Sequence, residues 1–319
     1  MYQNKRVLLI AGGGTLGTYV SRELLRLGAD VEVICPEEKV SDNEHLLFHQ
    51  SLATEELLRS LFAEKHYDGI VNFIHYKSVE SYKAIHPLLI ANTDHLIFLS
   101  SYRVYANEQH PITEEAPRLT EVITDPDFLE NETYAVPKSH CEDYLRKDCA
   151  GQPWTIVRPV ISFSKLRLDL LMYSGQRILD AADSGHELLL PALAKDYQAG
   201  LDWAGNSGKL IANLLFKPEA FGDTFTVYSG HGLTWGEIAE IYQRLTGLKI
   251  RWCSEKEYLS FHEALSHSRG LTWAWKHDRR YNRDVDCAKI LRTTGLTPSD
   301  FATVEEGLIH ELRLLGRQA

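Results

Sequence analysis

The stretch Gly12-Gly13-Gly14-Thr15-Leu16-Gly17 decides the fold of this 319-residue chain. A short apolar run, Val7-Leu8-Leu9-Ile10-Ala11, precedes it, and apolar residues at helical spacing follow it. Between a strand and a helix, the spacing G-x-G-x-x-G is typical of a turn that holds the phosphates of a dinucleotide. The first glycine allows a tight turn, the second lets pyrophosphate approach the backbone, and the third lets the helix pack closely on the strand. We therefore expect phosphate binding where this helix starts, by Gly12, Gly14, Thr15, Leu16 and Gly17.

Strand-like and helix-like segments alternate through the first half of the chain. The predicted strands are residues 6–11, 31–35, 69–74, 95–100 and 155–157. The predicted helices are residues 15–27, 54–62, 78–91 and 134–148. Because strands that alternate with helices form parallel βαβ units, we expect an α/β protein with a Rossmann-type doubly wound parallel sheet. The proline-containing stretch 107–132 is predicted to be a long loop, and such loops are usually functional.

The alternation stops after Arg158-Pro159. Predicted helices at residues 168–182, 207–215, 234–245 and 304–315 and short strands at 224–228 and 249–252 follow in no regular order. We therefore predict two domains. Residues 1–160 form a Rossmann domain that binds NAD(P), to which segments from about residues 200–230 return. Residues 161–319 form a smaller C-terminal α+β domain that mainly binds the substrate.

The composition is that of an ordinary globular protein, with 44% hydrophobic and 24% charged residues. There are 34 Lys and Arg residues against 44 Asp and Glu, and the net charge of −10 disfavours nucleic acid as a partner. No apolar run reaches the roughly 18 residues that a membrane span needs. Five scattered cysteines without a Cys-x-x-Cys pair indicate reduced thiols and a cytoplasmic protein, and the histidine spacing indicates no metal site. The partner that we expect is a small-molecule substrate.

Tyr134 and Lys138 lie four residues apart, on one face of the last predicted helix of the first half. Thr133 or Asn131 is expected to cap that helix. A fixed ammonium group favours the phenolate and lowers the pKa of a tyrosine, which can then act as a general base. Ser101 follows the fourth predicted strand, and ligands bind at the carboxyl ends of parallel strands. A serine there can hydrogen-bond a substrate hydroxyl beside the tyrosine.

The order of these motifs resembles the extended short-chain dehydrogenases/reductases, in their NAD-dependent epimerase/dehydratase branch. The resemblance runs through residues 12–17, 100–105 and 134–138 to Arg158-Pro159. It implies that Ser101 is the catalytic serine and Tyr134 the acid/base. It also implies that Lys138 binds the cofactor ribose and lowers the tyrosine pKa. The implied cofactor is NAD or NADP, with a slight preference for NAD.

Several positions depart from the family pattern. Cys35-Pro36 stands where an acid that binds the ribose of NAD is expected, and Lys39 can approach a 2′-phosphate instead. Ile74 and His75 replace small residues and are expected to crowd the channel along the cofactor. Ser101-Tyr102-Arg103 stands where sugar-nucleotide dehydratases carry Thr-Asp-Glu, and this difference disfavours a 4,6-dehydratase.

The candidate substrate-binding residues are Tyr102, Arg103, Arg279, Arg280 and Arg283, because arginines bind phosphate and carboxylate groups bidentately. Together the motifs indicate an NAD(P)-dependent oxidoreductase or epimerase that acts on a hydroxyl-bearing, carbohydrate-like substrate, a class that includes nucleotide sugars. The alternative is a regulatory or RNA-associated protein that keeps the cofactor site with weak or no catalysis. The sequence does not decide between epimerisation and simple oxidation, and it leaves a homodimer open.

Overall fold

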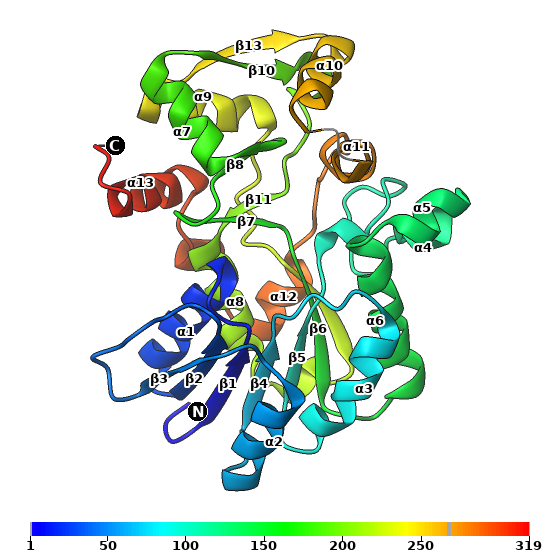
Figure 1. The fold of residues 1–319 in the computed structure, drawn as a ribbon, viewed down its shortest axis with the longest axis vertical. Helices are drawn as coiled ribbons and strands as arrows, with labels where there is room; N and C mark the ends of the chain where they lie inside the picture. The colour runs from blue at the N-terminus through cyan, green and yellow to red at the C-terminus, as the bar shows by residue number, and fades with distance from the viewer. Residues whose placement is uncertain (1, 267–268, 319) are drawn as a thin grey trace.

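A computed structural model describes residues 2–266 and 269–318 of the chain (Figure 1). Its centre is a sheet of seven parallel strands in the order β12-β6-β5-β4-β1-β2-β3. The strands are β1 Arg6–Ile10, β2 Asp30–Cys35, β3 Leu46–Gln50, β4 Gly69–Asn72, β5 Leu96–Leu99, β6 Trp154–Pro159 and β12 Asp223–Val227. The chain runs outward from β1 to β3 and then crosses back to β4 on the other side of β1. This reversal confirms the predicted doubly wound Rossmann-type sheet.

Helices cover both faces of the sheet because successive residues of a strand point to opposite faces. Val7 and Leu9 of β1 share one core with α1 Thr15–Leu27, α8 Ala204–Leu214 and α12 Ala288–Thr294. Leu8 and Ile10 of the same strand share another core with α2 Glu55–Glu64, α3 Val79–Ile90 and α6 Ala135–Asp148. The near-continuous apolar sequence of the strand follows from this burial on both sides.

A separate hydrophobic core lies beyond the carboxyl ends of the strands, in the upper part of Figure 1. Its strands pair as β7 Ile161–Phe163 with β11 Leu201–Trp203, β10 Glu187–Pro191 with β13 Lys249–Cys253, and β8 Asp169–Leu170 with β9 Tyr173–Ser174. Its helices are α7 Gly175–Ser184, α9 Trp235–Thr246, α10 Glu255–Ser266 and α13 Val304–Leu314, while Trp273 of α11 Arg269–Ala274 packs on a smaller cluster around Phe128. Parts of the second half nevertheless return to the main sheet, since β12, α8 and α12 all pack on it.

Two predicted segments differ from the structure. The predicted helix 168–182 is a hairpin, β8 and β9, followed by the shorter helix α7. Residues 168–171 and 173 are all buried. A short run of buried residues fits both a strand and a helix, so its periodicity does not distinguish the two. The predicted loop 107–132 contains two short helices, α4 Leu119–Val122 and α5 Pro126–Asn131. In α5 the proline occupies the first turn and Asp125 accepts a hydrogen bond from the backbone N–H of Asp127, so local capping supports the turn.

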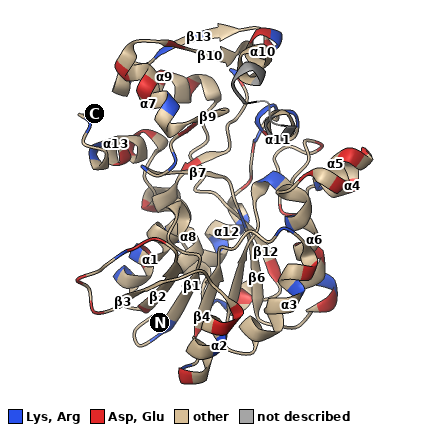
Figure 2. Cartoon of the chain, viewed as in Figure 1, with Lys and Arg blue, Asp and Glu red and all other residues tan. Residues whose placement is uncertain are grey.

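Acidic residues, coloured red in Figure 2, are frequent in α2 and at the tip formed by α4 and α5. Within the described part of the chain, no helix combines the length and the apolar character that a membrane crossing requires. The same residues contain no group of three or more His, Cys, Asp or Glu side chains arranged to hold a metal ion.

Candidate active site

A cleft of about 890 Å³ runs along the carboxyl ends of the sheet strands, where α/β proteins bind their ligands. One end is formed by the glycine-rich turn and the start of α1, and the other by Ser101, Tyr134 and the region around β8 and α7. The cleft therefore joins most of the predicted cofactor residues to Ser101 and Tyr134 in one continuous space, whereas Gly12 and Lys138 are not among the residues that line it. Gly14, Thr15, Leu16 and Gly17 all line it.

The glycine-rich turn has the geometry that the sequence predicted. Gly14 precedes the first turn of α1, and a Cβ atom at Gly14 would meet no other atom within 4 Å. A Cβ atom at Gly17 would lie 2.1 Å from the carbonyl oxygen of Gly12, so only glycine permits this close packing. The open side of Gly14 and the first-turn N–H groups of α1 fit the pyrophosphate of a dinucleotide.

The end of β2, where a ribose-binding acid is expected, carries a carboxylate that sequence reasoning missed. Cys35 is buried, but a Cβ atom at Gly13 would lie only 2.6 Å from Oε2 of Glu37. Glu37 therefore reaches the glycine-rich turn from two residues beyond the strand. The ammonium group of Lys39 donates a hydrogen bond to the carbonyl oxygen of Gly13. Because Glu37 lies beyond the strand, the residue at the strand end does not indicate it.

Tyr134 stands at the beginning of α6, where a buried carboxylate fixes the backbone. Oε2 of Glu132 accepts hydrogen bonds from the backbone N–H groups of Tyr134, Ala135 and Val136 at 2.9, 2.6 and 3.0 Å. The prediction that Thr133 or Asn131 caps this helix is therefore wrong. A carboxylate at a helix N-terminus satisfies free N–H groups and interacts favourably with the helix dipole.

Replacing Glu132 by Ala is expected to lower the free energy of unfolding by about 1–2 kcal/mol, because three backbone N–H groups lose their acceptor. Chemical denaturation followed by circular dichroism measures the change. Thr133→Ala is the matched control, since Thr133 is exposed and adjacent. Equal stability of the two variants would contradict the assignment of Glu132 as the cap.

Three groups around the Tyr134 ring control its ionisation. Nζ of Lys138 lies 5.3 Å and the guanidinium carbon of Arg103 lies 4.7 Å from the ring centroid, and Ser101 hydrogen-bonds the phenol. Burial alone would raise the pKa of Tyr134, but the two cations and the Ser101 hydrogen bond outweigh it and lower that pKa. Lys138 is itself held by a 2.7 Å hydrogen bond from Nζ to the carbonyl oxygen of Leu99.

His75 lies against Tyr134 rather than across the cleft. The two ring centroids are 5.1 Å apart, and Nε2 of His75 is 2.8 Å from the carbonyl oxygen of Thr133. Ile74 packs into the core beside the helices α2 and α3. Phe73 is the residue of this segment that lines the cleft. The expected crowding by Ile74 and His75 is therefore not the arrangement that the structure shows.

The predicted arginine group divides into three different environments. Arg279 lines the cleft, with Nη2 2.8 Å from Oδ2 of Asp169. Arg283 is buried and does not itself line the cleft, and it donates hydrogen bonds to the carbonyl oxygen of Tyr105 and to Asp278. Arg280 is exposed and pairs with Glu255 at 3.1 Å. Of the three, only Arg279 is placed to meet a ligand in the cleft.

The other candidate substrate residues lie in the cleft wall. Tyr102 and Arg103 form a short turn after β5, in which Oγ of Ser101 accepts a hydrogen bond from the backbone N–H of Arg103. The hydroxyl of Tyr102 donates a 2.6 Å hydrogen bond to Asp278. Lys165 and Arg167 also line the cleft, and no motif in the sequence identified them.

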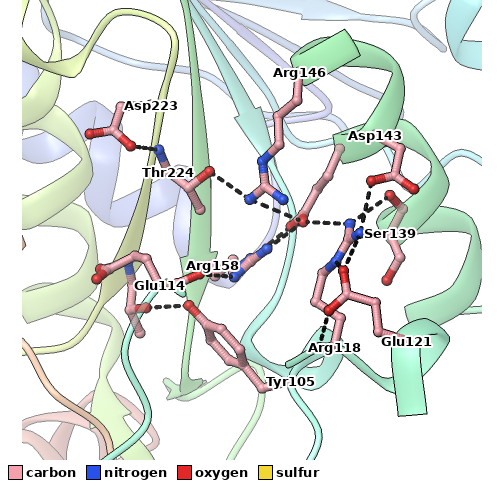
Figure 3. Close-up of polar contacts among 12 residues, drawn as sticks. Tyr105, Glu114, Arg118, Glu121, Ser139, Asp143, Arg146, Arg158, Asp223 and Thr224 are labelled. Atoms are coloured by element: carbon pink, nitrogen blue, oxygen red, sulfur yellow. Dashed lines mark hydrogen bonds and ion pairs between the residues drawn. The ribbon is translucent and has the colours of Figure 1, made fainter. Parts of the chain in front are cut away.

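Arg158 of the Arg-Pro motif belongs to a buried ion network rather than to the cleft (Figure 3). Its guanidinium donates hydrogen bonds of 2.8 and 2.5 Å to the carboxylate of Glu142 in α6 and one of 3.2 Å to the carbonyl oxygen of Glu114. Arg118 extends the network to Asp143 and Glu142. Burial would raise the pKa of Glu142, but Arg158 outweighs it and lowers that pKa to about 2. The network ties α6 to β6.

This chain has the fold of the NAD-dependent epimerases and dehydratases, which confirms the expected resemblance at the level of fold. An epimerase from Methanothermobacter thermautotrophicus superimposes with a TM-score of 0.72 at 16% identity, over 99% of this chain and 93% of that one. The dTDP-glucose 4,6-dehydratase of Bacillus anthracis, in complex with NAD, gives 0.71 at 16% identity over 98% and 96%. The UDP-glucose 4-epimerase of Thermotoga maritima, with UDP-glucose, gives 0.68 at 15% identity over 98% of both chains.

No protein-family model and no curated protein matches the sequence. Because one of the similar structures is a 4,6-dehydratase, the comparison gives no support to the sequence-based exclusion of that reaction. At identities of 14–17% the shared feature is the fold, and the chemistry has to be argued from the cleft.

Proposed function

We propose that the protein is an NAD(P)-dependent oxidoreductase or epimerase that acts on a hydroxyl-bearing, carbohydrate-like substrate. The observation that carries this proposal is the single cleft that connects Gly14, at the start of α1, with Ser101 and Tyr134. A ligand can thus reach the phenol while a dinucleotide lies along the strand ends. We further propose that residues 1–160 mainly bind the cofactor and residues 161–319 mainly bind the substrate.

In the proposed reaction, Tyr134 acts as a phenolate and takes the proton of the substrate hydroxyl. Ser101 orients that hydroxyl beside the phenol. Lys138, whose Nζ donates a hydrogen bond to the carbonyl oxygen of Leu99, keeps the phenolate stable, and we assign it the role of binding a cofactor ribose. A bound nicotinamide would supply the hydride acceptor.

The activity is expected to rise with pH until Tyr134 is ionised, because the phenolate is the reactive form. Since the Tyr134 pKa is lowered, this rise should end below the ordinary tyrosine value of about 10. Lys138→Met removes a cation that lowers this pKa, while burial continues to raise it, so the pH profile should move to higher pH. The measurement is kcat/KM for hydroxyl oxidation as a function of pH, with Lys147→Met, exposed on the same helix, as control. An unmoved profile in Lys138→Met would contradict the role of Lys138.

We propose NAD rather than NADP as the cofactor, because the Glu37 carboxylate at the glycine-rich turn can accept a ribose hydroxyl and repel a 2′-phosphate. Glu37→Ala is expected to weaken NAD⁺ binding by about tenfold, the value of a charge-assisted hydrogen bond, without weakening NADP⁺ binding. Titration of both cofactors by calorimetry measures this. Glu38→Ala, one exposed residue further on, should change neither affinity. A parallel loss of both affinities in Glu37→Ala would refute the assignment.

The experiment that tests the function is a thermal-shift titration with NAD⁺, NADH, NADP⁺ and NADPH, followed by a panel of sugar nucleotides in which reduction of the cofactor is monitored. A cofactor at a hundred times its Kd should stabilise the protein by about 2.7 kcal/mol. No shift with any of the four would overturn the proposal. A shift without turnover of any hydroxyl compound would favour the regulatory alternative.

A further inference from the structure

Arg103 is a cation beside the reacting phenol, and its ion pairs with neighbouring carboxylates are long. Its Nε lies 3.4 Å from Asp278 and its Nη2 lies 3.6 Å from Glu132. Nε is buried and has no hydrogen-bond partner in the described part of the protein. The ion pair of Arg158 shows the contrast, since its nitrogens lie 2.5 and 2.8 Å from Glu142.

Each of the two carboxylates near Arg103 has one oxygen engaged by other donors, Oδ1 of Asp278 and Oε2 of Glu132. Asp278 accepts hydrogen bonds from Tyr102 and Arg283, and Oε2 of Glu132 accepts three from the backbone of α6. Arg103 faces the other oxygens, Oδ2 of Asp278 and Oε1 of Glu132, in contacts that are too long or poorly aligned to be hydrogen bonds. Its guanidinium therefore retains capacity to bind an anion, which a bidentate guanidinium does well.

The residues around the cleft carry an excess of positive charge, as Arg103 does. Among the described residues that line it, four are basic and two are acidic: Arg103, Lys165, Arg167 and Arg279 against Asp169 and Asp278. The chain as a whole carries a net charge of −10, so this excess of cations is local. Such a cleft attracts a negatively charged ligand.

We infer that the substrate carries a carboxylate on the same carbon skeleton as the reacting hydroxyl, and that Arg103 binds it. The position supports this, because the Arg103 guanidinium carbon is 4.7 Å from the centroid of the Tyr134 ring. An anion held there belongs to the part of the substrate that reacts. The substrate class is thus a sugar acid. This inference rests on the proposed function, since it identifies the substrate of that same site.

The test compares D-glucuronate with D-glucose, which differ in the carboxylate, by calorimetric titration in the presence of saturating NAD⁺. We expect glucuronate to bind at least about tenfold more tightly, because it gains a charge-assisted hydrogen bond. Arg103→Met should abolish this preference, and Arg103→Lys should keep part of it, because lysine retains the charge without the bidentate geometry. Arg59→Met, on the exposed face of α2, is the control that should keep it fully.

Three results would overturn the inference. One is that the wild-type protein shows no preference for glucuronate, either because it binds both sugars equally or because it binds neither. Another is a preference that persists in Arg103→Met. The third is a loss of UDP affinity in Arg103→Met as large as the loss of glucuronate affinity, because Arg103 would then serve a diphosphate. If Arg103→Met fails to fold, the wild-type and Arg103→Lys titrations still decide.

Cofactor binding is measured separately, so that failure of the proposed function can be distinguished from failure of the inference. The same titrations are repeated without NAD⁺, and NAD⁺ binding is measured on its own. A protein that binds NAD⁺ and shows no preference for the sugar acid retains the proposed function and loses the inference. A protein that prefers glucuronate but binds neither NAD⁺ nor NADP⁺ keeps the anion site and loses the proposed function.

Discussion

Tyr134→Phe should lower turnover by about 100-fold or more while leaving cofactor affinity nearly unchanged. The phenol oxygen is the only atom removed, and the ring still packs between Arg103 and His75. The substrate hydroxyl then lacks the Tyr134 base. Burial lowers the pKa of the nearby Lys138 ammonium as well, but Nζ of Lys138 donates a hydrogen bond to the carbonyl oxygen of Leu99, so we do not expect it to replace the phenol. The rate of cofactor reduction with a sugar that the unmodified protein oxidises gives kcat, and calorimetry gives the NAD⁺ affinity.

Tyr144→Phe is the matched control for this variant, because Tyr144 lies in the same helix outside the cleft lining. Its turnover should equal that of the unmodified protein. Unchanged turnover in Tyr134→Phe would remove the phenol from the chemistry. A large loss of NAD⁺ affinity in the same variant would instead make Tyr134 a binding residue.

Gly14→Val should abolish nucleotide binding and leave the fold intact. A Cβ atom at Gly14 would point into open space, so the added isopropyl group meets no protein atom that must move. It would occupy the side of the turn that the pyrophosphate needs. We expect no detectable thermal shift with NAD⁺ or NADP⁺, at an unchanged melting temperature of the free protein.

Thr18→Val is the control for the glycine variant. Its hydroxyl donates a hydrogen bond to the carbonyl oxygen of Gly14, within the same first turn of α1, but it does not line the cleft. Cofactor affinity should survive this change. A normal cofactor titration of Gly14→Val would show that the phosphates bind elsewhere.

Much of the fold follows from the sequence because its strongest signals are local. The glycine turn lies between a fully apolar strand and an amphipathic helix, and α1 spans residues 15–27 in both the prediction and the structure. The hairpin after residue 168 could not be predicted in this way. Its apolar residues are buried by a second core whose members come from distant parts of the chain, and periodicity carries no information about such contacts.

The residues of the site also fall into two groups, those placed by local sequence signals and those placed by distant contacts. Ser101, Tyr134 and Lys138 come together because each lies at a fixed place on a strand end or helix start. The predicted arginine group does not form one site, since Arg280 pairs with the exposed Glu255 and Arg283 is buried against the carbonyl oxygen of Tyr105 and Asp278. Glu37 and Glu132 act through the reach of a flexible side chain, which the sequence does not encode as a motif.

The buried network of Arg158 has a consequence for where the reactive groups can sit. Apolar contacts are non-directional, whereas the pairing of Arg158 with Glu142 is directional and fully desolvated. A slide of α6 by one residue, about 1.5 Å, would separate these charges inside the protein. Glu142 follows Lys138 by one turn, so the network sets the axial register of the phenol and the ammonium together. The distance from the sheet to the reacting hydroxyl is thereby fixed by charges that never touch a ligand.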